Sequence, residues 1–124
     1  MAILRGSVAR RGRHAWLVWD TTCADTVVAF PIRPPPRYRR RHLVPLLSPA
    51  DRLLSCCTDE ALIQLYRPAR LNREGLQHSG EISGAVQCAV VQSLVRLHIE
   101  QRTAERWTAD RVHRRRAAEE SYIL

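Results

Sequence analysis

Apolar residues gather in four short runs in the first half of the chain, and charged or turn-forming residues separate these runs. Val, Leu, Ile and Trp are frequent in each run, as is typical of β-strands. The predicted strands are Ile3–Val8, Ala15–Asp20, Val27–Ile32 and His42–Leu47. The links between the first three are short, and short links favour antiparallel neighbours because parallel pairing needs a long crossover. The pattern therefore predicts a hairpin-rich sheet.

The middle of the chain is less regular. Leu53–Cys57 and Ala61–Tyr66 are interpreted as two further strands, although Asp59–Arg67 could equally begin a helix. Pro68 then breaks the pattern, and we expect Asn72–Gly80 to form a loop or irregular structure.

From Glu81 onward, apolar residues recur every three or four positions, which predicts a helix with one apolar face. That face contains Ile82, Val86, Ala89, Val90, Leu94 and Leu97. Ser79 is the expected N-cap, and Glu81 places negative charge near the positive end of the helix dipole. Beyond Ile99, Arg and Glu alternate, so the helix is expected to run into solvent or to meet a partner.

A chain of 124 residues has room for one hydrophobic core. Because the strands come first and the long helix last, we predict a mainly β or α+β domain with the helix packed across the sheet. We place this single domain at residues 1–107 and expect residues 108–124 to be a charged, frayed tail.

The positive charge of the chain is concentrated near its start. Residues 1–41 hold nine Arg against two acidic residues, a local balance of +7, whereas residues 42–124 hold eleven Arg against ten acidic residues. A one-sided basic surface attracts a polyanion such as nucleic acid. The alternative is a solubilising surface without a specific partner.

One segment of this basic region, Pro34–Arg41, has the sequence PPPRYRRR. The prolines hold an extended backbone, so the segment is interpreted as a basic loop that grips an RNA backbone while Tyr38 stacks on a base. The RNA-binding candidates in it are Arg37, Tyr38, Arg39, Arg40 and Arg41. A solvated linker is the alternative interpretation.

Cysteine and histidine usage gives no indication of a metal site. The four Cys form no C-x-x-C pair, and the adjacent Cys56 and Cys57 cannot easily bridge to each other. We expect the thiols to be small core residues in a reducing cytoplasm. The histidines lack metal-ligand spacing, so no metal and no cofactor are predicted. No run approaches the ~20 apolar residues of a membrane span, and the start lacks the features of a secretory signal.

Several strings, in their order along residues 5–99, resemble the MazF/PemK family of toxin endoribonucleases. The strings are Arg5-Gly6 at an opening strand, Arg13-His14 before AWLVW, VVAFPIR at 27–33, and IQLYR at 63–67. The resemblance implies a small SH3-like antiparallel barrel closed by a long C-terminal helix. It also implies metal-independent cleavage of single-stranded RNA by the toxin of a type II toxin-antitoxin system, with an acidic antitoxin and a homodimer as partners.

The same resemblance assigns the candidate catalytic residues. Arg13 matches the family's Arg of an Arg-Pro pair, and Arg67 stands where the family has a second Arg. His14 replaces the Pro of that pair, Arg33 replaces a Thr, and Ile63 replaces an Asp. These departures favour retention of the fold with altered or lost activity.

Elementary chemistry adds roles for the same region. Cleavage of RNA needs a group that moves a proton and a cation that stabilises the phosphorane. His14 could be the base or acid, because imidazoles exchange protons near neutral pH. Arg13 and Arg33 could hold the phosphate, although neighbours on a strand point to opposite faces, so Arg13 and His14 share a site only at a bulge or turn.

Gln64 could read a base edge. The structural alternatives are a surface histidine at 14, a solvated Arg67 and a buried Gln64. Three functions follow: an endoribonuclease toxin, a non-catalytic nucleic-acid-binding or partner-binding protein on the same fold, and an interaction protein whose exposed helix Glu100–Arg116 docks on another chain.

Overall fold

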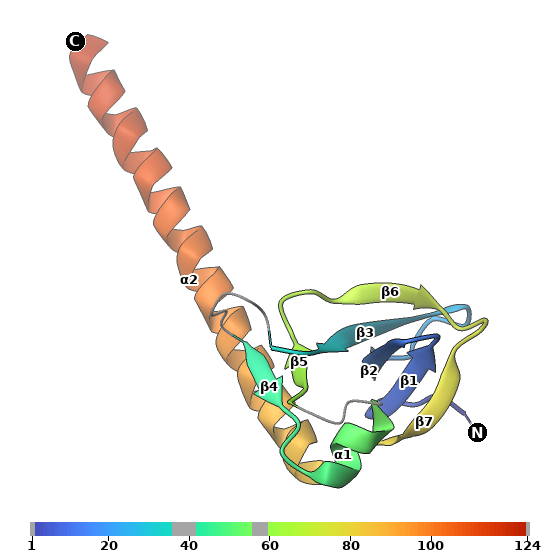
Figure 1. Ribbon diagram of the computed structural model, residues 1–124. Helices are drawn as coiled ribbons and strands as arrows, with labels where there is room; N and C mark the ends of the chain where they lie inside the picture. The colour runs from blue at the N-terminus through green and yellow to red at the C-terminus, as the bar shows by residue number, and fades with distance from the viewer. Residues whose placement is uncertain (1, 36–41, 56–59, 124) are drawn as a thin grey trace. The chain divides into compact units, whose positions relative to one another are not determined.

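The computed structural model describes residues 2–35, 42–55 and 60–123, and Figure 1 shows the order of the helices and strands. The elements are β1 Ser7–Arg11, β2 His14–Asp20, β3 Thr26–Arg33, β4 Leu43–Pro45, α1 Pro49–Leu54, β5 Leu62–Gln64, β6 Ala69–Asn72, β7 Gln77–Glu81 and α2 Gly84–Ile123. The chain divides into two compact units, residues 1–93 and residues 94–124. The first unit contains the sheet, α1 and the start of α2, and the second is the remainder of α2.

The seven strands form one antiparallel sheet in the order β4-β5-β3-β2-β1-β7, with β6 also pairing with β3. The α+β class with a long C-terminal helix is therefore as predicted. The sheet is not closed into a barrel, which corrects the expected SH3-like barrel: within the described residues, the edge strands β4 and β7 do not pair with each other. Closure needs long, tilted edge strands, whereas β4 has three residues and ends at Pro45, which has no amide hydrogen to donate.

The β1–β2 hairpin has a two-residue turn, Gly12–Arg13, because Arg11 pairs with His14. Gly12 has a φ of +61°, whereas Arg13 has a negative φ. Glycine at the first central position of a two-residue turn is the pattern of a type II′ turn, whose twist matches that of the flanking strands. The turn fixes the register of the whole hairpin and holds Arg13 at its tip.

Strand β2 is covered on both faces, since four consecutive residues, Ala15 to Val18, are buried. On one face, a cluster of buried residues contains Ala9, Trp16, Val18, Val27 and Ala29, and the half-buried Ile3, Leu71 and Leu76 pack against it. Leu17 on the other face is fully buried. Burial of a side chain of this size stabilises the fold by about 1.5 to 3 kcal/mol.

Three of the first four predicted strands have a counterpart of similar extent or position. β2 and β3 match Ala15–Asp20 and Val27–Ile32, and β4 is a shorter form of His42–Leu47. The first strand is Ser7–Arg11 rather than Ile3–Val8, because the positive φ of Gly6, +87°, bends the chain just before it. Among the later predictions, Ala61–Tyr66 contains β5.

The predicted strand Leu53–Cys57 is wrong over its described part, because residues 53 and 54 end helix α1. Pro49 stands in the first turn of α1 and Asp51 follows it there. Proline is preset for the first helical turn, and acidic residues are favoured there by the helix dipole. Pro49 and Asp51 are therefore a sequence signal for the start of a helix. Cys56 and Cys57 lie outside the described residues.

The predicted loop Asn72–Gly80 contains the end of β6 and most of β7. β7 has the sequence QHSGE, so hydrophobic alternation gives no indication of a strand, and its backbone pairing with β1 creates it. Ser79 is accordingly not the N-cap of the last helix. It lies in β7, where its hydroxyl donates a hydrogen bond of 2.6 Å to the carbonyl oxygen of Leu54 in α1.

Helix α2 begins at Gly84, three residues later than the predicted start at Glu81. Within the first unit, Val86 and Val90 of α2 are buried and lie one turn apart, as the predicted apolar face requires. In the second unit the helix extends through Ile123, and fraying of residues 108–124 stays a prediction. The predicted domain limit at residue 107 lies inside this helix. No helix in the described part of the chain is both long and apolar enough to cross a membrane.

Candidate functional site

Trp16 of β2 lies at the centre of the densest group of candidate residues. The ring centroids of His14 and Trp16 are 5.8 Å apart, with the planes tilted by 54°. The Cζ atom of Arg33 lies 5.7 Å from the centroid of the Trp16 ring. We call His14, Trp16 and Arg33 the Trp16 cluster. The indole is only 8% exposed, whereas His14 is exposed and Arg33 is half-buried, so the histidine and the arginine offer the cluster's surface to a ligand.

The local structure explains why these three residues meet. His14 and Trp16 are two positions apart on β2, so their side chains lie on the same face of the sheet. Ala15 pairs with Ile32 across the β2–β3 ladder, and the next antiparallel pair outward brings His14 opposite Arg33. The guanidinium over the indole contributes about 0.5 to 1 kcal/mol as a cation–π interaction. The buried indole thus orients both polar groups.

Gln64 of β5 lies close to this cluster in the sheet, because Arg33 pairs with Leu62 and Gln64 follows two residues later on the same face. The Gln64 residue is only 7% exposed. It therefore offers a ligand little surface, which agrees with the alternative of a buried glutamine better than with a group that reads a base edge.

Arg13 and Arg67 are both exposed, and neither is part of the Trp16 cluster. Arg13 occupies the tip of the β1–β2 turn, so strand alternation does not apply to it. Arg67 lies in the connection between β5 and β6, where its backbone N–H donates to the carbonyl oxygen of Gln64 at 3.4 Å. Among the described residues, neither guanidinium contacts His14 or Trp16. Of the predicted catalytic and phosphate-holding groups, His14 and Arg33 are the two that contact the Trp16 ring among the described residues.

The predicted basic loop lies mostly outside the described residues. This applies to its RNA-binding candidates Arg37, Tyr38, Arg39, Arg40 and Arg41.

Several arginines that contribute to the basic balance have structural roles that sequence reasoning missed. Arg11 donates from Nη2 to the carbonyl oxygens of Asn72 and Glu74 at 2.7 and 2.6 Å. Arg73 donates to the carbonyl oxygens of Thr21 and Cys23 at 2.9 and 3.1 Å. Both therefore join segments more than 45 residues apart in sequence. Arg11 is one of the nine arginines of residues 1–41, so the charge count of that segment includes at least one guanidinium with a structural role.

A second arginine–tryptophan contact lies farther along β2. Arg5 donates from Nε to the carbonyl oxygen of Trp19 at 2.8 Å, and its Cζ atom lies 5.4 Å from the Trp19 ring centroid. Asp20 follows directly. The backbone N–H of Thr22, 2.9 Å from an Asp20 carboxylate oxygen, lowers the pKa of Asp20, with help from the Thr22 side chain and from the charges of Arg5 and Arg70.

The expectation of cysteines as core residues is wrong for Cys23 and Cys88, which are both exposed free thiols. Arg70 donates to the Sγ atom of Cys23 at 3.5 Å and to the hydroxyl of Thr26 at 3.2 Å. No group of three or more potential ligands that could hold a metal ion occurs in residues 2–35, 42–55 and 60–123. No family model matches the chain, and the search of curated proteins found no match.

Proposed function

We propose that the protein binds single-stranded RNA at the Trp16 cluster. The observation that carries the proposal is the arrangement of an exposed imidazole and a guanidinium over one buried indole. Unpaired bases stack on aromatic rings and on Arg guanidinium planes, and the same guanidinium can hold a phosphate in pairs of hydrogen bonds. Arg13, at the tip of the adjacent turn, adds a second cation within one residue of His14.

Binding without catalysis is favoured over cleavage by the neighbours of the cluster. Ile63 stands where the MazF/PemK family has an acidic residue, and its side chain is fully buried in the core. Arg13 and Arg67, the two arginines assigned from the resemblance, are not among the described residues that contact the Trp16 ring. The group of residues expected for acid–base cleavage is therefore incomplete.

A second candidate function is metal-independent RNA cleavage by the toxin of a type II toxin-antitoxin system. It is supported by one observation: a residue that can move a proton, His14, and a residue that can stabilise a phosphorane, Arg33, lie on the same indole. An acidic antitoxin and a homodimer belong to this second proposal, as does an SH3-like fold in which the open sheet is a divergent form of the family's barrel.

The test of the first proposal is fluorescence anisotropy with labelled single-stranded RNA at several salt concentrations. Arg33→Gln removes one phosphate contact, so affinity is expected to fall about 10-fold and the salt slope to decrease by about 0.7. Arg10→Gln is the matched control. Arg10 is also half-buried, but it lies on the opposite face of the sheet from the Trp16 cluster, because its neighbour Ala9 pairs with Trp16. Equal losses in both variants would sink the proposal.

The second candidate is tested on the same RNA with EDTA present. Cleavage that leaves cyclic phosphate ends and disappears in His14→Gln would support it. Intact RNA in the presence of tight binding would leave the protein as a binder without activity.

A further inference from the structure

The second unit of the chain exposes a large aromatic side chain beside a run of cations. Trp107 in α2 is 66% exposed. Between residues 102 and 116 there are six Arg and two acidic residues, a local balance of +4. Trp is highly buried on average, and it is enriched among the residues that carry the energy of binding at interfaces.

Helical spacing places Trp107 together with two of these cations. Arg111 and Arg114 follow Trp107 by four and seven residues, so all three lie on one face of the helix. They span about 10 Å along the axis, at 1.5 Å per residue. All three are exposed. We call these three residues the Trp107 face.

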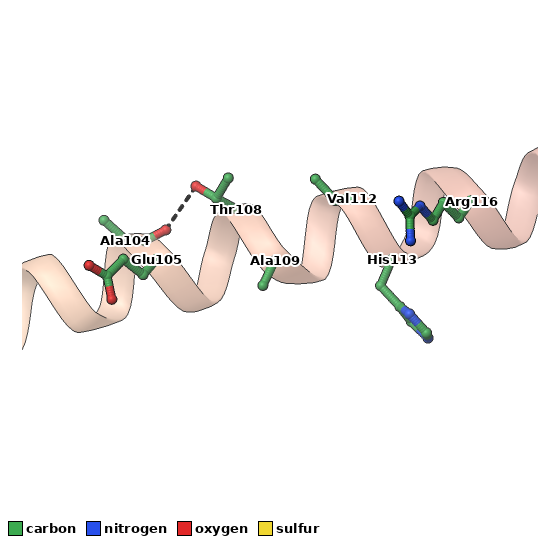
Figure 2. Close-up of a pocket in the computed structure, with 7 residues that line it drawn as sticks. All are labelled: Ala104, Glu105, Thr108, Ala109, Val112, His113 and Arg116. Carbon is green, nitrogen blue, oxygen red and sulfur yellow. Dashed lines mark hydrogen bonds between the residues drawn. The ribbon is translucent and has the colours of Figure 1, made fainter.

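The neighbouring stretch of the helix has a different character. Figure 2 shows the side chains along it, which mix small or apolar residues (Ala104, Thr108, Ala109 and Val112) with Glu105, His113 and Arg116 and include no aromatic ring of the size of an indole. The Thr108 hydroxyl donates to the carbonyl oxygen of Ala104 at 3.0 Å, so this polar group is already satisfied within the helix. The Trp107 face thus differs from this stretch in having an exposed indole beside its cations.

We propose that the Trp107 face is a second contact for single-stranded RNA, with a base stacked on Trp107 and the phosphate backbone held by Arg111 and Arg114. This inference rests on the proposed function, because it assigns a further surface to the same ligand. A stacking aromatic flanked by cations is the arrangement that single-stranded nucleic acid selects, since every base has a π-face and every linkage a charge.

A second copy of the helix fits this face less well. Going back along the same face from Trp107, the positions are Thr103, Glu100 and Arg96, and going forward they are Arg111 and Arg114. A coiled-coil seam needs apolar residues at such positions. Two parallel copies would place like charges opposite each other. In two antiparallel copies centred on Trp107, Glu100 would meet Arg114, but Arg96 and Arg111 would stay uncompensated, and burying unpaired charges costs several kcal/mol per ion. Charge complementarity thus favours a polyanion.

The test compares two double variants of the full-length chain in the RNA anisotropy assay. Arg111→Gln with Arg114→Gln removes the cations of the Trp107 face. Arg102→Gln with Arg106→Gln is the matched control: it removes two exposed cations from the same helix, one turn apart, on a different face. The first variant is expected to weaken binding about 10-fold or more and to lower the salt slope by about 1.4, whereas the control changes the affinity less than 2-fold.

Trp107→Phe leaves the net charge unchanged, so its effect on binding tests the stacking of a base on the indole by itself. RNA is expected to quench the tryptophan fluorescence of the wild-type chain, and the variant should lose much of that quenching, because Trp107 is 66% exposed whereas Trp16 is buried and Trp19 is half-buried. Circular dichroism checks that the helix content of every variant equals that of the wild type.

The outcomes separate this inference from the proposed function. Equal losses in the two double variants would mean non-specific attraction and would overturn the inference. Unchanged binding in both, together with weakened binding in Arg33→Gln, would overturn the inference and leave the Trp16 cluster as the RNA site. No binding by the wild-type chain would overturn both. A dimer seen by sedimentation and lost in the Arg111/Arg114 variant would assign the face to self-association and also overturn the inference.

Discussion

The carboxylate of Asp51 in α1 accepts two hydrogen bonds from Ser83, one from its backbone N–H at 3.1 Å and one from its hydroxyl at 2.8 Å. Ser83 immediately precedes α2, and its carbonyl oxygen accepts the first intrahelical bond, from the N–H of Gln87 at 3.1 Å. Ser83 is thus the N-cap of α2, and a carboxylate from another helix satisfies it. The negative charge also lies at the positive end of the α2 dipole.

Asp51→Ala is expected to lower the free energy of unfolding of the first unit by about 3 kcal/mol, because a residue that is 4% exposed loses two charge-assisted bonds. Asp51→Asn keeps an acceptor and should cost about 1 kcal/mol. Urea unfolding followed by fluorescence measures both. Asp25→Ala, at an exposed aspartate, is the control and should change stability by less than about 0.5 kcal/mol. If Asp51→Ala behaved like this control, the cap would contribute nothing measurable.

Gly6→Ala tests the close approach of the residue just before β1 to the first turn of α2. Gly6 has a φ of +87°, and a Cβ there would lie 2.8 Å from the Nε2 atom of Gln87. Both the backbone strain and the contact oppose a side chain, so the expected loss of stability is about 1 to 3 kcal/mol. Gly84→Ala is the control, since open space surrounds that position and its φ is not positive. It should be neutral or slightly stabilising, and thermal unfolding of both variants distinguishes the two cases.

Adding Gln87→Ala to Gly6→Ala separates the two causes. The double variant relieves the contact with the Gln87 side chain but leaves the positive φ, so part of the lost stability is expected to return. Full recovery would show that the backbone conformation carries no strain.

The Asp20 carboxyl is expected to titrate below its ordinary pKa of 3.8, chiefly because it accepts a hydrogen bond from the Thr22 amide. A lowered pKa in the folded state means that the folded chain holds this proton more weakly than the unfolded chain. Its contribution to stability is therefore present above the ordinary pKa and is lost as pH falls through the folded-state value. Carbon-detected NMR titration measures the midpoint.

Two variants identify the causes of that shift. Thr22→Val removes the hydroxyl but keeps the amide donor, so the Asp20 pKa should rise yet stay below its ordinary value. Arg5→Gln removes one nearby charge and should raise the pKa by a smaller amount, because the carboxylate is exposed and water screens the interaction. A midpoint at or above 3.8 in the wild-type chain would contradict the assignment.

Sequence reasoning succeeds where hydrophobic pattern and secondary structure agree. Strands β2 and β3 carry their own apolar runs, and the buried Val86 and Val90 have the period of a helix. Sequence reasoning fails where backbone pairing with another strand, rather than the hydrophobic pattern, determines the secondary structure. β7 contains no large apolar residue and becomes a strand through its bonds to β1, and no local feature announces that partner.

The candidate site was predictable only in part, for a related reason. The residue types at His14 and Arg33 were readable, but their meeting on Trp16 depends on the β2–β3 register, which pairs residues from two separate runs. Long-range hydrogen bonds such as that from Arg11 to the carbonyl oxygen of Glu74 cannot be predicted from sequence, because the fold alone determines which arginine lies near a distant carbonyl group. Charge counts alone therefore cannot separate structural arginines from those that bind ligands.

The difference between structural and ligand-binding arginines gives the last prediction, in which substitutions at Arg11 and Arg33 have opposite effects. Arg11→Gln breaks hydrogen bonds to two carbonyl oxygens and should lower the free energy of unfolding by about 1 to 2 kcal/mol, while the affinity of the folded chain for RNA changes less than 2-fold. Arg33→Gln should weaken RNA binding but change the free energy of unfolding little, because the substitution removes only the contact between the guanidinium and the Trp16 ring. Urea unfolding and RNA anisotropy on both variants measure the four values. If Arg11→Gln weakened RNA binding as much as Arg33→Gln without loss of stability, the binding surface would extend across β1 and the structural role assigned to Arg11 would be wrong.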